Sequence, residues 1–96
     1  MYVTVLVRMS GGDRDTLIGL GKQAKSIVEK AGAESFSLVQ VFTGPHTGDL
    51  LVAVRFPNWD VLGKAQQSFS NDPAFLALAA QIAPCVAERN LVVGLI

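Results

Sequence analysis

Charge is scarce in this chain of 96 residues: 17% of them are charged, and 8 basic side chains balance 8 acidic ones. Globular proteins average about 25% charged residues. Nucleic acids and anionic membrane surfaces are bound mainly through clustered Lys and Arg, so a net charge of zero argues against both partners. Half of the residues are hydrophobic, which is more apolar side chain than a monomer of this length easily buries. We therefore expect the protein to associate with itself.

Cysteine and histidine are nearly absent. Cys85 is the only cysteine, so it has no partner for an internal disulfide, and His46 is the only histidine. Neither residue belongs to a cluster with metal-ligand spacing, and we expect no metal and no cofactor. Haem ligation or general-base catalysis by His46 is the weakest of the site hypotheses, because a lone loop histidine is more often a solvated turn residue.

Long apolar runs and a secretory signal are also missing. The most apolar tract, residues 74–87, is interrupted by Gln81 and Pro84 and is shorter than the roughly 20 residues that span a bilayer. The first residues alternate β-branched side chains and lack the basic segment and cleavage site of a signal peptide. These features predict a cytoplasmic protein with no membrane partner.

The hydrophobic periodicity predicts the element order β-α-β-β-α-β. Strands are expected at residues 2–9, 35–43, 49–56 and 89–96, and an amphipathic helix at residues 13–31. A second helical region is capped by Asn58, restarts at Asn71-Asp72-Pro73 and ends at Pro84. Gly19 and Gly21 interrupt the first helix, either as a tolerated weakness or as a mark of close backbone packing.

Connection rules turn this order into an architecture. Two right-handed helical crossovers and a hairpin between the second and third strands give an antiparallel sheet with the spatial order 4-1-3-2. The predicted fold is an α+β, ferredoxin-like βαββαβ plait, with one domain spanning residues 1–96 and helices on one face of the sheet only.

Strand parity sorts the side chains onto two faces of this sheet. The parity assigned to the helices is almost entirely hydrocarbon: Val3, Val5, Val7, Met9, Leu50, Val52, Val54, Phe56, Leu91, Val93 and Leu95. The opposite parity should be polar if it met water, yet Leu6, Leu51 and Val92 lie on it. In the second strand, either parity fits either face. We expect a second copy to cover this apolar face, giving a homodimer with a cavity between the two sheets.

A few polar side chains interrupt the second face and are the candidates for a binding pocket. A buried guanidinium needs an anion or a carbonyl oxygen, so Arg8 and Arg55 indicate a ligand or, alternatively, salt bridges at the rim of the dimer. The indole of Trp59 serves either as a pocket wall or as ordinary packing at a helix start. The pocket candidates are Tyr2, Arg8, Gln40, Arg55, Trp59 and Asn90, and a small apolar or aromatic molecule is the expected ligand.

Several of these features resemble the dimeric α+β barrel superfamily. They are the element order, the strand at 51–56 that runs into the helix start at Trp59, the Asn71-Asp72-Pro73-Ala74-Phe75 restart and the closing strand at 89–92. The resemblance covers the whole chain and is nearest to small bacterial domains of the antibiotic-biosynthesis-monooxygenase type. The haem-degrading members carry a helical histidine that this chain lacks, so the resemblance does not extend to haem.

This resemblance implies two functions of different classes. One is cofactor-independent oxygenation or isomerisation of a planar organic substrate, in which the substrate's own enolate or phenolate supplies the electrons. The other is a non-catalytic ligand-binding or dimerisation domain. The fold does not decide between them, and neither does any motif in the sequence, so whether the protein is an enzyme stays open here.

Overall fold

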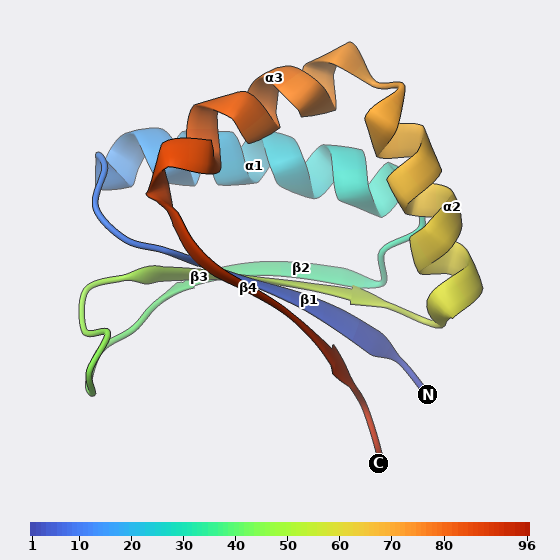
Figure 1. Cartoon of the computed structure of the whole chain (residues 1–96), viewed down its shortest axis with the longest axis horizontal. Helices are drawn as coiled ribbons and strands as arrows, with labels where there is room; N and C mark the ends of the chain where they lie inside the picture. The colour runs from blue at the N-terminus through green and yellow to red at the C-terminus, as the bar shows by residue number, and fades with distance from the viewer.

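The computed structural model describes residues 1–96. Its elements are β1 (Val3–Met9), α1 (Arg14–Lys30), β2 (Ser35–Gln40), β3 (Leu50–Phe56), α2 (Trp59–Ser70), α3 (Pro73–Ile82), a 3-10 turn (Ala83–Cys85) and β4 (Val86–Val93). The strands form one antiparallel sheet in the order β2-β3-β1-β4. All three helices lie on the same side of it (Figure 1). The predicted ferredoxin-like plait and its strand order are confirmed.

Each helix begins where the sequence supplies a cap. The side chains of Asp13, Asn58 and Asp72 each accept a backbone hydrogen bond of 2.9 Å from the first turn of the helix that follows. Such caps satisfy N–H groups that the helix itself leaves without partners. Pro73 occupies the first position of α3, where a missing N–H costs nothing. None of the helices is long and apolar enough to cross a bilayer.

Strand register assigns the side chains to the two faces. Val5 lies opposite Val54 of β3 and Leu91 of β4, as the predicted helix-side face requires. In β2, Phe36 lies opposite Val54 and therefore shares that face. Ser37 and Val39 lie opposite Ala53 and Leu51, so their side chains point to the other side of the sheet. This side carries no helix, and we call it the open face. The ambiguity of the second strand is thereby resolved.

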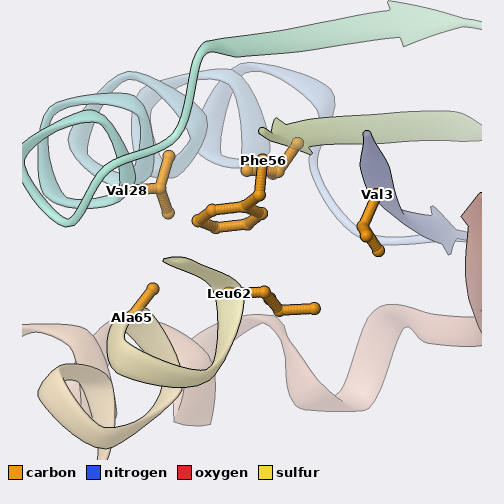
Figure 2. Close-up of a cluster of buried hydrophobic side chains, with 6 residues drawn as sticks. Val3, Val28, Phe56, Leu62 and Ala65 are labelled. Atoms are coloured by element: carbon orange, nitrogen blue, oxygen red, sulfur yellow. The ribbon is translucent and has the colours of Figure 1, made fainter. Parts of the chain in front are cut away.

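The core lies between the sheet and the helices as two clusters. The first surrounds Phe56, which is 1% exposed and lies between β1, α1 and α2 (Figure 2). Its other buried members are Val3, Val28, Val54, Leu62 and Ala65. The second cluster consists of Met9, Leu17, Leu20, Leu50 and Leu78. The core therefore lies on the predicted face of the sheet.

The bounds of β2 and β4 differ by three residues from the predicted ones. β2 ends at Gln40 instead of residue 43, because the chain turns into the hairpin loop there. β4 begins at Val86 instead of Arg89 and ends at Val93. A bulge between Arg8 and Met9 lets β4 pair as early as Val86. Just beyond the start of β1 and the end of β4, the Gly94 N–H still donates to the Tyr2 carbonyl oxygen at 2.8 Å.

Candidate functional site

A cavity of about 460 Å³ lies between the sheet and the helices, and 18 of its 22 lining residues are hydrophobic. Valines of β1 and β3 form its floor: Val5, Val7, Val52 and Val54. One side is formed by α1, and the roof by α2 and α3. The valines are short, and Ala24 of α1 and Ala79 of α3 also contribute small side chains to the lining. These small side chains leave a volume within the range of small-molecule sites.

Aromatic rings line the roof of this cavity. Phe69 near the end of α2 and Phe75 in the first turn of α3 stack with ring centroids 4.2 Å apart and an interplanar angle of 12°. The break between the two helices, capped by Asp72, brings the rings together. Phe36 and Phe56 line the cavity as well. A flat ring system would find aromatic contacts above it and a smooth aliphatic floor below it.

Polar side chains are confined to the mouth of the cavity. On α2, α3 and β4, the exposed lining residues are the apolar Leu76 and three polar ones, Gln66, Ser70 and Arg89. The Ser70 hydroxyl is occupied, because it donates to main-chain carbonyls one turn back in α2, at 2.9 and 3.1 Å. Arg89 is the only charged lining residue, and neither salt bridge of the chain involves it. The mouth therefore carries one cation that is free to bind an anion.

The lining limits the chemistry of the cavity. It contains no His, Cys, Asp, Glu or Tyr, and no group of three or more metal-ligating side chains gathers anywhere in the chain. What the cavity provides is an apolar environment and one guanidinium at its edge. Such a site stabilises an anionic oxygen on an otherwise apolar molecule, because the charge finds a partner while the ring loses water.

None of the sequence candidates lines this cavity. This cavity lies on the helix side; the cavity expected between the two sheets of a dimer is distinct from it and stays a prediction. Strand parity does not predict the helix-side cavity, because parity identifies the facing side chains but not how closely the helices approach the sheet. Arg89 is the residue that sequence reasoning missed. Arg89 alternates in phase with Leu91 and Val93, and this spacing predicts that its side chain lies on the helix side of β4. The strand register confirms this, because Arg89 lies opposite Val7.

Arg8 and Arg55 lie on the open face, as expected from parity, and each pairs within its own chain. Arg8 Nη1 lies 2.8 Å from Asp49 Oδ2, and the Arg8 side chain is only 17% exposed. Arg8 Nε is buried without a partner. The hydrogen bond from Arg8 holds the pKa of Asp49 below its usual value. The open face therefore contains a nearly buried ion pair with one donor left over.

Arg55 belongs to a second polar group at the other end of the open face. Its Nε lies 3.1 Å from Glu34 Oε2, and its guanidinium carbon lies 3.5 Å from the centroid of the Tyr2 ring. Tyr2 in turn covers Gly94, where a side chain would overlap the ring. The structure thus brings Tyr2 and Arg55 together, while Arg8 lies apart from them.

The remaining candidates are dispersed. Asn90 donates to the Glu88 side chain at 3.0 Å on the open face. Gln40 lies at the helix-side parity of β2 and donates to a hairpin-loop carbonyl at 3.4 Å. Trp59 is the first residue of α2 and is 52% exposed, and His46 is exposed in the hairpin loop. The structure assembles no single site from them.

The sequence matches no family model and no curated protein, but solved structures resemble the chain closely in fold. Rv0793 from Mycobacterium tuberculosis is 18% identical with a TM-score of 0.72, over 100% of this chain and 97% of its own. SnoaB from Streptomyces nogalater, described as a cofactor-independent oxygenase, is 14% identical with a TM-score of 0.75, over 97% and 92%. A dimeric Bacteroides fragilis protein of unknown function and ferredoxin-like fold is 12% identical with a TM-score of 0.56, over 95% and 92%. The chain thus shares the ferredoxin-like fold of these structures.

Proposed function

We propose that this protein is a homodimer in which each subunit binds one planar, largely apolar molecule, with Arg89 binding an ionised oxygen of that molecule. The observation that carries the proposal is the cavity of about 460 Å³, lined almost entirely by hydrophobic residues. A pocket of this composition favours an apolar ligand, and the lone guanidinium favours one that bears a negative charge at its edge.

The open face supports the dimer. No helix covers it, and Leu6, Leu51, Ala53 and Val92 form its apolar surface. A two-fold axis would bring the same surface of a second copy against it. The unpartnered Nε of Arg8 lies on this face, and a partner subunit would offer it an acceptor. In this arrangement the open-face candidates serve association, and the helix-side cavity serves binding.

Two naphthalene probes test the binding site. We expect 2-naphthol to bind more tightly than 2-methoxynaphthalene as the pH rises and the naphthol ionises, because only the naphtholate engages Arg89. Arg89→Gln should remove this preference, and Arg89→Lys should retain part of it. Fluorescence titration of both probes across pH with the three proteins measures the effect. Equal binding of the two probes by the unmodified protein at every pH would contradict the role of Arg89.

A pair of neighbouring alanines in α3 supplies a matched control for the location of binding. Ala79 lines the cavity, whereas Ala80 is exposed and does not. Ala79→Leu should weaken both probes by about tenfold, because the added methyl groups occupy the ligand's space, a cost of order 1–3 kcal/mol. Ala80→Leu should leave binding unchanged. The same effect from both substitutions would show that the probes bind elsewhere.

Cofactor-independent oxygenation is a second candidate, favoured by the combination of Arg89 with a cavity that holds no acid or base. In the net reaction, R₂CH₂ and O₂ give R₂C=O and H₂O, so the substrate carbon loses the four electrons that O₂ gains. Because the cavity holds no base, the proton lost in forming the enolate passes to water at the mouth of the cavity. The guanidinium stabilises the enolate, which donates the electrons to O₂, and the apolar walls keep bulk water from the ring. The likeness to SnoaB supports the same chemistry.

Oxygen uptake tests this candidate. An enolisable fused-ring ketone is incubated with the protein in an oxygen electrode without added metal or cofactor. We expect uptake to exceed the buffer rate and to fall with Arg89→Gln more than with Ala80→Leu. Uptake at the buffer rate, with the naphthol probes still bound, would leave the protein as a ligand-binding dimer.

A further inference from the structure

A second depression lies on the opposite side of α1, between that helix and the edge strand β2. It has a volume of about 330 Å³. We call it the α1–β2 groove. Its apolar wall includes Ile18, Phe36 and Leu38. Leu38 reaches toward α1 because Gly21 has no side chain, and a Cβ there would lie 2.9 Å from Leu38 Cδ2.

Three cations border the groove, and no acidic residue does. They are Arg14, Lys22 and Lys25, with Gln40 as the remaining polar side chain. All three cations are exposed, and the two salt bridges of the chain, at Arg8 and Arg55, use none of them. The protein has no net charge, so these three unpaired cations beside one apolar wall form a local positive patch that attracts anions.

Helix geometry defines how these groups are spaced. Lys22 and Lys25 stand three residues apart, so their side chains leave α1 on the same face about 4.5 Å apart along its axis. Arg14 lies about 12 Å further toward the N-terminus, and Ile18 lies between it and Lys22. A single anionic group fits between the two lysines, and an apolar chain or ring extending from it would run over Ile18 toward Arg14.

We propose that the α1–β2 groove binds an amphiphilic anion, a phosphate or carboxylate attached to an alkyl chain or ring. Lys22 and Lys25 bind the anionic group, and Ile18, Phe36 and Leu38 contact the apolar part. This site is separate from the helix-side cavity, although Gly21 and Phe36 form part of the wall of both. The proposal does not depend on the function proposed for that cavity.

Four small probes test the groove: octyl phosphate, octanoate, inorganic phosphate and octanol, each below any micelle-forming concentration. Titrations followed by amide chemical shifts report both affinity and location. We expect octyl phosphate or octanoate to shift amides of α1 and β2 along the groove, and their relative affinities identify the preferred anionic group. Inorganic phosphate and octanol should bind at least tenfold more weakly, because each satisfies only half of the site.

Charge substitutions with a matched control complete the test. Lys22→Gln with Lys25→Gln should weaken the binding of the amphiphilic anion about tenfold, since two solvent-exposed charge contacts are lost. Lys22→Arg with Lys25→Arg should retain binding. Lys30→Gln with Lys64→Gln removes the same charge from exposed positions outside the groove and should have little effect. Circular dichroism confirms that all three proteins are folded.

Three outcomes would overturn the proposal. Inorganic phosphate binding as tightly as octyl phosphate would show an unspecific cation patch, and octanol binding as tightly would show an apolar surface only. Shifts confined to residues around Arg89, abolished by Ala79→Leu but not by the lysine substitutions, would place the probe in the helix-side cavity. That last outcome would leave the proposed function intact, so the two proposals fail separately.

Discussion

At Gly19 a side chain would meet nothing within 4 Å, whereas at Gly21 a Cβ would lie 2.9 Å from Leu38 Cδ2. Both glycines lie in the interior of α1, and neither has a positive φ. The sequence allows two explanations for a glycine in this helix, a tolerated weakness or close backbone packing, and each applies to one of the two positions. Gly19 is a tolerated weakness of the helix, and Gly21 marks the close packing of α1 on β2.

Gly19→Ala should stabilise the protein by about 1 kcal/mol, because alanine loses less backbone entropy on entering a helix and has free space here. For a domain of this size this corresponds to roughly 4–8 °C in Tm. Gly21→Ala gains the same propensity but must displace Leu38, so its stabilisation should be smaller or reversed. Urea unfolding of both variants measures the difference. Equal gains at the two positions would mean that Leu38 moves at no cost.

Asp49 makes stability sensitive to acid. Its folded-state pKa lies below the usual 3.8, chiefly because Arg8 donates a hydrogen bond to it. The Thr16 side chain, and then its backbone N–H, lower the pKa of Asp13 in the same way. A depressed folded-state pKa contributes stability above the unfolded-state pKa, and this contribution is lost as the pH falls below about 3.8 through the lower folded-state value.

Asp49→Asn should therefore lower Tm at pH 7, where it leaves the Arg8 guanidinium without its counterion in a nearly buried position. The difference from the unmodified protein should shrink at pH 3, because this pH lies below the unfolded-state pKa and the stabilisation by the Asp49 carboxylate is lost as the pH falls further. Thermal unfolding at both pH values measures this. Glu29→Gln, an exposed acid near the end of α1, serves as the control and should show no such convergence. A constant Tm difference at both pH values would exclude a contribution from the charge of Asp49.

Among the elements, α3 links helix capping to the cavity. Asp72 Oδ1 accepts hydrogen bonds from the backbone N–H groups of Ala74 at 2.9 Å and Phe75 at 3.4 Å. Phe75 and Leu78, which follow in α3, line the roof. The cap therefore positions the aromatic pair of Phe69 and Phe75 as well as the start of the helix.

Asp72→Ala should destabilise the protein by about 1 kcal/mol, the usual cost of losing an N-cap. It should also weaken binding of 2-methoxynaphthalene, because fraying of the first turn of α3 disturbs Phe75. Asp72→Asn retains an acceptor and should restore most of both properties. Thermal unfolding and fluorescence titration measure the two effects. A loss of stability without any loss of binding would show that the roof does not depend on this cap.

Sequence patterns predict the helix starts and the strand order correctly, because each depends on a simple rule. The three caps are local hydrogen bonds, and the order of the strands follows from connection handedness. The start of β4 was predicted three residues late, because the bulge at Arg8 and Met9 depends on how β1 and β4 meet. Gln40 was not assignable to a face, since its register is set by pairing with β3.

The helix-side cavity is not predictable from the sequence for a related reason. Its floor residues, such as Val52, were correctly assigned to the helix side, but periodicity does not report the distance between a helix and the sheet that it covers. The position of Arg89 was contained in the strand pattern, opposite Val7. A strand predicted over 89–96 puts Arg89 at its end, whereas β4 spans Val86–Val93 and places Arg89 within the sheet.

At the scale of the whole molecule, the excess of apolar side chains is divided between two faces of one sheet. The helix side buries its share in the core clusters and leaves the cavity. The open face has no covering element in the chain, and its centre is formed by Leu6, opposite Ala53 and Asn90. A homodimer built on this face accounts for the composition and leaves both the cavity mouth and the α1–β2 groove on the helix side.

Leu6→Asp should convert the proposed dimer into a monomer, because it places a carboxylate at the centre of the apolar interface, where burial of an unpaired charge costs several kcal/mol. Leu6 points away from the helices, so the core should persist and circular dichroism should change little. Ser26→Asp adds the same charge on an exposed position of α1 and should leave the dimer intact. Sedimentation velocity at micromolar concentration distinguishes the two states. If the unmodified protein already sediments as a monomer, the open face requires another partner. The proposals for the helix-side cavity and the α1–β2 groove are unaffected by that result, because both sites lie on the opposite side of the sheet.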